Sequence, residues 1–227
     1  MEALHLRFAP LRETPQEVLD CELSVLGHAY GDTPELLEEA YGRYREDTAF
    51  VSLWWRDEAV GFVRFIRPGR HELKTLADIR KEPWGVDGAG IARGLGVDLD
   101  RTWDLATIGV RRHDREVPAR ATPALVRGFA EVLRANDVEW LIAIVDETAR
   151  RLMSMYGIRS LPLPGTRAEE YMGSPACQPA FGRVDESAEG LCAQPLPSLH
   201  LPAADELRWP ETALAAPGRP AVARRRA

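Results

Sequence analysis

A run of six residues without a polar side chain, Trp140 to Val145, limits the folds open to this chain more than any other segment. Strands with one face in water alternate polar and apolar residues, so a continuous apolar run predicts a strand that is buried on both faces. Such strands belong to sheets that helices cover on both sides. An earlier segment, Thr102 to Val110, is rich in β-branched and aromatic residues and predicts a second strand.

A helix is predicted after each of these strands. Thr122 and Pro123 form an N-cap and first-turn pair for the first helix. Its apolar stripe comprises Leu125, Phe129, Val132 and Leu133. The second helix is expected from Thr148 to Tyr156 and is ended by Gly157. The order of strand, loop, helix, strand and helix predicts an α/β fold of the α+β type.

A basic loop joins the first of these strands to the first helix. An arginine cluster spans the loop and the helix start and comprises Arg111, Arg112, Arg115, Arg120 and Arg127. The whole chain carries a net charge of -6, so this positive cluster is a local exception. A loop of this charge ahead of a helix N-terminus favours an anion such as a phosphate. A solvated loop with exposed arginines is the alternative.

The segments before this unit predict a half-buried strand at Leu4 to Phe8, two helices that start near Thr14 and Thr33, and a hairpin over 50–67. The segment from Lys81 to Asp100 contains five glycines and is long for a connection. It predicts either a lid over a site or a loose surface loop.

Residues 1–185 are expected to form one domain. After this point the chain becomes rich in proline and alanine. Residues 186–227 are therefore expected to be mostly disordered, apart from a docked piece around Leu196 to Trp209.

Composition excludes several classes of protein. With 35 acidic against 29 basic residues, the chain is not expected to bind nucleic acid. Cys21, Cys177 and Cys192 give neither a disulfide framework nor a metal-binding motif, which fits a reducing cytoplasm. No signal peptide or membrane-spanning segment is recognised, so a cytoplasmic protein without a metal is expected.

Three passages carry motifs known from one group of enzymes. The segment Ala59 to Pro68 contains a Gly-x-x-Arg strand that ends in Pro. The segment Trp103 to Val110 is similar to a strand with the pattern Trp-Glu-x-Ser-Arg-Phe-x-Val, and Ala149 to Ile158 to a helix that ends Leu-x-x-x-Gly-Trp. Together these passages resemble the GNAT acyltransferase superfamily, and within it the acyl-homoserine-lactone synthases and N-acyl amino acid synthases.

The resemblance implies a central mixed sheet with a splayed strand pair and helices on both faces. An acyl thioester would lie with its pantetheine arm along the splayed strands. The implied reaction is N-acyl transfer from acyl-CoA, or from acyl-phosphopantetheine on an acyl carrier protein, to the amine of a small metabolite such as an amino acid. These donors are cosubstrates, and no permanently bound cofactor is expected. The residues assigned to donor binding are Arg111, Arg112, Arg115 and Arg120.

Arg64 and Asp104 are the predicted catalytic residues. Each is a charge among apolar neighbours on a strand face, so each needs a partner. If the two strands are neighbours, as the resemblance implies, the residues either form a buried ion pair or hold a substrate between them. In the functional interpretation, Asp104 orients or deprotonates the amine, and Arg64 holds the acceptor's carboxylate or balances the charge of the site. Backbone N–H groups of Ile108, Gly109 and Val110 would stabilise the oxyanion.

The resemblance also implies a pocket for the acceptor and the acyl chain, formed by Trp103, Thr107, Met153 and Tyr156. Thr107 stands where the homoserine-lactone synthases have Arg, and Met153 where many CoA-dependent relatives have a general-acid Tyr. Two alternatives stay open: Thr107 argues against the first of them, and both departures favour the second. One is a homoserine-lactone synthase that uses S-adenosylmethionine, and the other is a non-catalytic binding module with the same fold.

Overall fold

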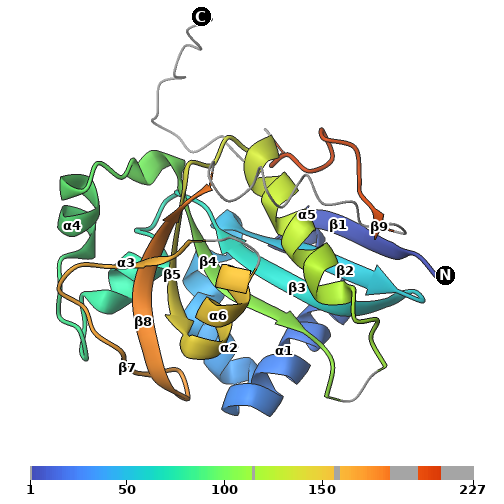
Figure 1. The fold of residues 1–227 in the computed structure, drawn as a ribbon, viewed down its shortest axis with the longest axis horizontal. Coiled ribbons are helices and arrows are strands. Elements are labelled where there is room, and N and C mark those ends of the chain that lie inside the picture. Colours follow the sequence, from blue (N-terminus) through green and yellow to red (C-terminus); the bar gives the residue numbers. More distant parts are fainter. Residues whose placement is uncertain (1, 114–115, 156–158, 185–198, 211–227) are drawn as a thin grey trace, which may run out of the picture.

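The computed structural model describes residues 2–113, 116–155, 159–184 and 199–210. Its strands form one mixed sheet in the order β6-β8-β5-β4-β3-β2-β1-β9, and β7 pairs with β8 (Figure 1). The strands are β1 Leu4–Pro10, β2 Thr48–Trp55, β3 Glu58–Ile66, β4 Thr102–Val110, β5 Trp140–Asp146, β6 Leu161–Pro162, β7 Glu169–Tyr171, β8 Ser174–Arg183 and β9 Leu199–His200. The helices are α1 Gln16–Tyr30, α2 Pro34–Tyr41, α3 Lys74–Ile79, α4 Gly88–Gly94, α5 Ala121–Ala135 and α6 Glu147–Met155. Short 3-10 helices occupy Leu11–Glu13, Gly42–Asp47 and Leu99–Arg101.

The central strands β4 and β5 run parallel but pair along only part of their length. The pairing joins Thr102, Trp103 and Asp104 to residues 140–142 of β5. Beyond this point β4 stays paired with β3, while β5 stays paired with β8 as far as Asp146. The two strands therefore diverge, and a wedge opens between them. The predicted mixed sheet with a splayed strand pair is confirmed.

A β-bulge lies where the two strands separate. The register between β3 and β4 shifts between Arg64 and Phe65. Their partners in β4 are Thr107 and Leu105, which leaves Ala106 as an extra residue. A bulge bends its strand and increases the local twist. We therefore attribute the divergence of β4 from β5 to the bulge at Ala106.

The bulge also changes which residues of β4 share a face. The alternation of side chains along a regular strand predicts that Asp104 shares a face with Ile108 and Val110. Ile108 and Val110 instead pack against the cluster beneath α5. Asp104 contacts α3 on the opposite face, and Thr107 contacts α1 on that same opposite face. The expectation was wrong because one extra residue reverses the alternation.

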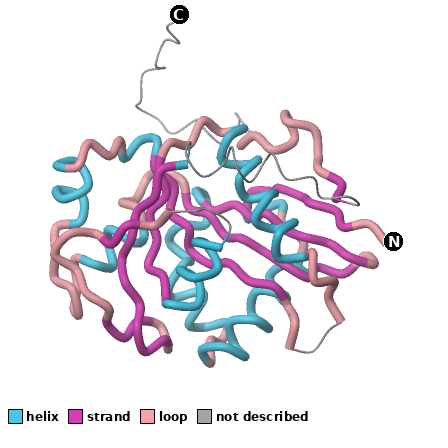
Figure 2. The backbone as a smooth tube through the Cα atoms, viewed as in Figure 1, coloured by secondary structure: helices cyan, strands magenta, loops and turns pink. Residues whose placement is uncertain are grey.

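Helices cover both faces of the sheet, as predicted (Figure 2). On β3, Val63 and Phe65 point toward α5, where the Phe65 ring stacks on Phe129 with 5.4 Å between ring centroids. Phe62 points to the opposite face, beneath α1 and α2. Arg64 shares the face of Phe62, as the alternation along β3 predicts.

The start of α5 differs slightly from the prediction. The helix begins at Ala121, so the predicted N-cap Thr122 lies inside it. The Thr122 hydroxyl accepts a hydrogen bond from the Arg112 guanidinium at 3.1 Å. A long-range contact therefore occupies the side chain that was expected to cap the helix.

The segment from Lys81 to Asp100 contains α4 and is packed onto the rest of the domain. Its apolar residues join a cluster that includes Ile79 of α3 and Ile142 of β5. The Trp84 indole N–H donates to the carbonyl of Arg167 at 2.8 Å. Of the two expectations, a lid or a loose loop, the loose loop is wrong.

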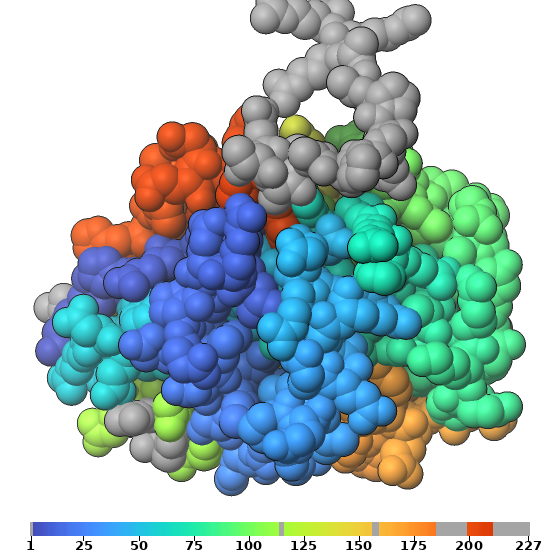
Figure 3. Space-filling view, turned by 180° about the vertical axis from the view of Figure 1, so that it is seen from behind, coloured from blue at the N-terminus to red at the C-terminus, as the bar shows by residue number. Residues whose placement is uncertain are grey.

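Part of the C-terminal segment docks at the edge of the sheet. β9 pairs in parallel with β1, and the rings of His5 and His200 stack with 4.7 Å between centroids. Asn136, after α5, bonds the backbone of Leu207 and of Trp209 at 2.8 and 2.7 Å, and both of these side chains are buried. Figure 3 shows this segment, in red, beside the dark blue N-terminal residues. The other residues of the predicted tail lie outside the described part of the chain.

Trp209→Ala should lower the free energy of unfolding by about 3 kcal/mol, because the indole fills a space between Phe8, Trp103 and Arg67. Leu201→Ala is the control: Leu201 lies in the same segment, is 37% exposed, and should change stability by about 0.5 kcal/mol or less. Urea unfolding followed by circular dichroism measures both. Equally small losses in the two variants would contradict the docking.

Candidate active site

A cavity of about 110 Å³ lies in the wedge between β4 and β5, on the face covered by α1. Apolar and polar side chains both line it, and we call it the polar cavity because of the polar groups that its walls carry. Its walls come from both strands, the end of α1, the loop that follows α1, α2, α6 and the β7–β8 hairpin. The polar side chains on these walls include Tyr30, Asp32, Tyr41, Thr107, Asp146 and Tyr171. A concave space with a few convergent polar groups is the usual form of a small-molecule site.

Two carboxylates line this polar cavity. Asp146, the last residue of β5, accepts hydrogen bonds from the Tyr30 hydroxyl at 2.6 Å and from the Ala149 N–H at 2.7 Å. Asp32 is half-buried in the turn after α1, and burial together with the charge of Glu22 raises its pKa. Burial and the nearby Asp146 also raise the pKa of the Tyr30 hydroxyl. The cavity therefore has an acidic wall.

An apolar cavity of about 20 Å³ lies on the other face of the same strands, beneath α5. Leu105 of β4 and Val145 of β5 line both cavities. The rest of the apolar wall comes mainly from α5, α6 and β8 and includes Phe129, Met153 and Ala180. The wedge thus separates a polar space on one face of the sheet from an apolar space on the other.

Two backbone N–H groups of β4 face the wedge. The Arg111 N–H donates to the Val60 carbonyl at 2.8 Å, which fixes the alternation of hydrogen bonds along β4. By this alternation the Gly109 N–H faces β3, whereas the N–H groups of Ile108 and Val110 face β5. Of the three residues expected to stabilise an oxyanion, Ile108 and Val110 present a donor to the wedge, and Gly109 does not.

The predicted ion pair between Arg64 and Asp104 does not form. Arg64 makes a bidentate pair with Glu22 of α1, through Nε at 2.9 Å and through Nη2. The Thr107 hydroxyl donates to the same carboxylate at 2.5 Å. Glu22 is 1% exposed and Arg64 is 6% exposed, so each charge is compensated inside the protein by the other.

Sequence reasoning missed Glu22, although its position in α1 carried a signal. The buried residues of α1 are Val18, Cys21, Glu22 and Leu26. Their spacing follows one face of a helix, so Glu22 stands within an apolar stripe. A carboxylate in such a stripe requires a buried cation. Arg64, which was expected to need a partner, is that cation.

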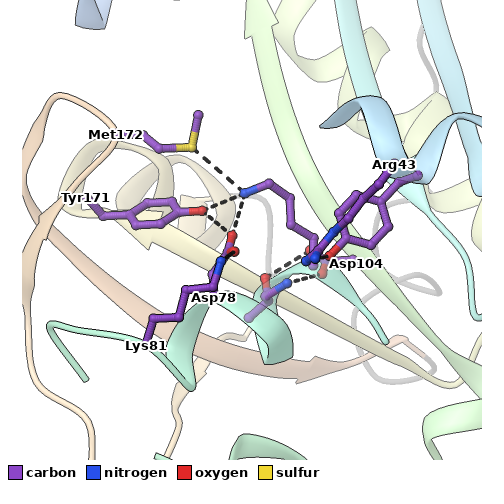
Figure 4. A network of polar contacts seen from close by, with 9 residues as sticks. Arg43, Asp78, Lys81, Asp104, Tyr171 and Met172 are labelled. Carbon is purple, nitrogen blue, oxygen red and sulfur yellow. Dashed lines mark hydrogen bonds and ion pairs between the residues drawn. The ribbon is translucent and has the colours of Figure 1, made fainter. Parts of the chain in front are cut away.

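Asp104 is buried behind the polar cavity and does not line it. Its two carboxylate oxygens accept hydrogen bonds from the Thr75 N–H at 2.5 Å and the Thr75 hydroxyl at 2.9 Å (Figure 4). Burial raises the pKa of Asp104 to about 6, although the Thr75 bonds and the charge of Lys74 oppose the rise. Asp104 therefore fixes the start of α3 to β4 and lies outside the lining of the polar cavity.

Lys74 connects α3 to Tyr171 on the wall of the polar cavity, and Tyr171 and Asp78 of the same network are labelled in Figure 4. Its Nζ lies 2.6 Å from Asp78 and 2.6 Å from the Tyr171 hydroxyl, which itself donates to Asp78 at 2.6 Å. Lys74 is 5% exposed, and no sequence feature had marked it as important. Because Tyr171 lines the polar cavity, this network holds the β7–β8 hairpin in place as part of the wall.

The basic loop leaves β4 at the open end of the wedge and is braced by its own arginines. Arg112 donates to the carbonyls of residues 117–119 at 3.3 to 3.4 Å. Arg120 donates to the carbonyl of Glu2. Arg115 lies outside the described residues.

The four predicted pocket residues lie in different surroundings. Thr107 lines the polar cavity, and Met153 lines the apolar cavity. Trp103 lines neither, because its ring is buried in the core between Phe65 and Trp209. Tyr156 lies outside the described residues. The expected pocket is thus divided between the two faces of the sheet, and Trp103 belongs to the core.

In the described part of the chain, no group of His, Cys, Asp and Glu side chains has the arrangement of a metal site. No helix among the described residues is long and apolar enough to cross a lipid bilayer. Cys21 and Cys177 are buried thiols, and burial raises the pKa of Cys177. A raised pKa makes Cys177 a poor nucleophile.

Glu22→Gln should destabilise the protein by about 3 to 5 kcal/mol, because Arg64 would stay buried without a counter-charge. Glu17→Gln, exposed in the first turn of the same helix, is the matched control and should change stability by about 0.5 kcal/mol or less. Chemical denaturation at neutral pH measures the difference. A similar small loss in both variants would mean that the buried pair contributes little.

Asp104→Asn should flatten the pH dependence of stability. The Asp104 pKa is about 6 in the folded protein and 3.8 without perturbation, so the folded state binds more protons between these values. The stability contributed by Asp104 is therefore complete below about pH 4 and lost as the pH rises through about 6, by at most about 3 kcal/mol. Denaturation of both proteins from pH 4 to 7 measures this. A constant difference between the two stability curves would contradict the raised pKa.

Several solved structures share this fold. LasI, an acyl-homoserine-lactone synthase, aligns with a TM-score of 0.61 at 10% identity, over 86% of this chain and 98% of LasI. BjaI, a CoA-dependent acyl-homoserine-lactone synthase solved with S-adenosylmethionine and isopentyl-CoA, aligns with a TM-score of 0.57 at 16% identity, over 95% of this chain and 100% of BjaI. FeeM, an N-acyl amino acid synthase from uncultured soil microbes, aligns with a TM-score of 0.58 at 12% identity, over 82% of this chain and 95% of FeeM.

No protein-family profile matches the sequence, and a search of curated protein sequences finds no match. Identities of 10 to 16% establish a shared fold and leave the activity open. The chain has the fold of the acyl-homoserine-lactone synthases and of an N-acyl amino acid synthase, as the three sequence passages predicted.

Proposed function

We propose that this protein is an N-acyltransferase that moves an acyl group from a thioester to the amine of a small metabolite. The observation that carries the proposal is the wedge between β4 and β5, with a polar cavity on one face and an apolar cavity on the other. Acyl transfer needs a polar space for the amine and an apolar space for the acyl chain, meeting at the reacting carbonyl. The folds of BjaI and FeeM support the same reaction class.

The donor would lie along β4 at the mouth of the wedge. The N–H groups of Ile108 and Val110 are about 7 Å apart along a strand, so they would contact different oxygens of the donor. One would donate to the thioester carbonyl and stabilise its developing negative charge, and the other to an amide of the pantetheine arm. The basic loop and the N-terminus of α5 follow in the chain and suit phosphate. Acyl-CoA and acyl-phosphopantetheine on a carrier protein both carry these groups.

The acceptor amine would bind in the polar cavity as an ammonium ion, beside Asp32 and Asp146. Asp32 is the better base, because its pKa is raised, whereas Asp146 already accepts two hydrogen bonds. Asp32 takes one proton, and the nitrogen lone pair attacks the thioester carbon. Collapse of the tetrahedral intermediate breaks the C–S bond. The nitrogen gives up a second proton to the leaving thiolate, which yields an amide and a free thiol. Asp32 then releases its proton to water.

Arg64 and Asp104 act in this scheme as positioning residues. Arg64 holds Glu22, which accepts from Thr107 on the cavity wall. Asp104 holds Thr75 at the start of α3, next to the network that fixes the cavity wall. These contacts support a role in which Arg64 and Asp104 position other residues of the site and do not touch the substrate themselves.

Thiol release tests the proposal directly. Purified protein with acyl-CoA or acyl-carrier-protein thioesters and a panel of amines should release free thiol. Asp32→Asn should lower kcat by about 100-fold or more without lowering the stability of the protein. Asp57→Asn, in the turn of the β2–β3 hairpin, is the control and should keep full activity. If no combination of donor and acceptor releases free thiol, the result would count against catalysis and favour a binding module.

Met153→Ala should shift the preferred acyl chain toward longer donors. The apolar cavity has room for about one water-sized sphere, so the protein should prefer short acyl groups. Removing Met153 from the wall should raise the kcat/KM for hexanoyl relative to acetyl donors by roughly tenfold or more. Met155→Ala, on the same helix but 77% exposed, is the matched control. If the ratio of kcat/KM for hexanoyl and acetyl donors is unchanged in the Met153 variant, the apolar cavity does not bind the acyl chain.

A homoserine-lactone synthase is the second candidate, because LasI and BjaI share the fold and the BjaI structure holds S-adenosylmethionine. In that reaction S-adenosylmethionine would supply the acceptor amine. Calorimetric titration with this compound separates the two candidates. Saturable binding that Asp32→Asn weakens would favour the lactone synthase.

A further inference from the structure

The polar cavity carries negative charge without a matching cation on its described walls. Asp32 and Asp146 line it, and none of the lining residues that the structure describes is Lys, Arg or His. Carboxylates in a partly buried space are costly unless a positive charge accompanies them. The raised pKa of Asp32 reflects this cost, since burial and the charge of Glu22 both oppose ionisation.

Two buried cations lie behind the wall, and both are engaged. Arg64 and Lys74 stand 4.5 and 4.8 Å from the ring of Tyr41, which lines the cavity. Arg64 is held by both oxygens of Glu22, and Lys74 is held by Asp78. Turning either cation into the cavity would leave a buried carboxylate without its partner, at a cost of several kcal/mol. Neither is available to bind the carboxylate of a substrate.

The remaining wall is suited to an organic cation. Aromatic faces attract ammonium groups within about 6 Å, and Tyr30, Tyr41 and Tyr171 line the cavity. Lys74 already stands 4.8 and 5.3 Å from the rings of Tyr41 and Tyr171, so Tyr30 is the ring left for the ammonium group of a ligand. Leu26 and Ile144 add apolar surface for the carbon skeleton. Acidic oxygens combined with aromatic faces are the chemistry that recognises an alkyl or aryl ammonium ion.

We infer that the acceptor is a cationic amine without a carboxylate, such as a simple alkyl amine, an aryl amine or a diamine. This inference rests on the proposed function, because it names the substrate class for the acceptor half of the same site. It differs from one of the two roles that the sequence predicted for Arg64, namely to hold the carboxylate of the acceptor. Both carboxylate oxygens of Glu22 bond to Arg64, so the charge of Arg64 is already compensated inside the protein.

The test compares probes that differ only in the carboxylate. Isothermal titration calorimetry would measure 3-methylbutylamine against leucine, and 2-phenylethylamine against phenylalanine. Each amine should bind at least about tenfold more tightly than its amino acid, because Asp32 and Asp146 repel the carboxylate of the amino acid. Leucine methyl ester, which keeps the ammonium group and masks the carboxylate charge, should bind more tightly than leucine.

Variants of the wall give the matched controls. Asp146→Asn should weaken amine binding by about tenfold and narrow the difference between each amine and its amino acid. Asp32→Asn should act in the same direction. Asp57→Asn removes an equal charge from the exposed hairpin turn and should leave both affinities unchanged. If the cavity variants and this control change the amine affinity equally, the preference would come from the net charge of the protein, and the inference would be overturned.

The outcomes separate this inference from the proposed function. Preferential amine binding without thiol release would uphold the inference and overturn catalysis. Turnover of amino acids at least as fast as of their decarboxylated counterparts would overturn the inference and uphold catalysis. Failure of every amine to bind, or tighter binding of S-adenosylmethionine than of any carboxylate-free amine, would also overturn it.

Discussion

The structure depends on the loss of pairing between β4 and β5 after three residue pairs. Beyond Asp104 each strand is hydrogen-bonded on its outer side only, to β3 or to β8, so the inner backbone groups of both strands face a gap. Backbone N–H groups in a partly buried gap require a hydrogen-bond partner, and a ligand in the wedge can supply one. The bulge at Ala106 therefore creates the wedge and also aims the N–H groups of Ile108 and Val110 into it.

The charge of the polar cavity follows from how the buried ions around it are paired. Glu22 takes Arg64, and Asp78 takes Lys74, so both cations are neutralised behind the wall. The carboxylates on the wall itself have no such partner among the described side chains. Buried pairs of this kind contribute little net stability, but separating them is expensive. The pairs thus fix a wall whose surface remains acidic.

The elements could be predicted from the sequence because local patterns determine them, as the apolar run of β5 and the stripe of α5 do. The need of Arg64 for a buried partner was also evident. The identity of the partner was not, because Glu22 lies 42 positions away and is brought to Arg64 only when α1 packs on β3. The predicted ion pair between Asp104 and Arg64 was wrong for another reason. A single extra residue at Ala106 reversed the faces of β4, and no turn residue or glycine marks that bulge in the sequence.

The position of α1 determines both the ion pair of Glu22 behind the cavity wall and the place of Asp32 on that wall. Gly109 lies beneath this helix, and a Cβ there would stand 2.8 Å from Val25 and 2.9 Å from Phe62. Any side chain at this position would push α1 away from β4. The same helix carries Glu22 and leads into Asp32, so that movement would separate Glu22 from Arg64 and shift the proposed base. Close packing of α1 on a glycine is therefore a condition for both the buried ion pair and the geometry of the cavity.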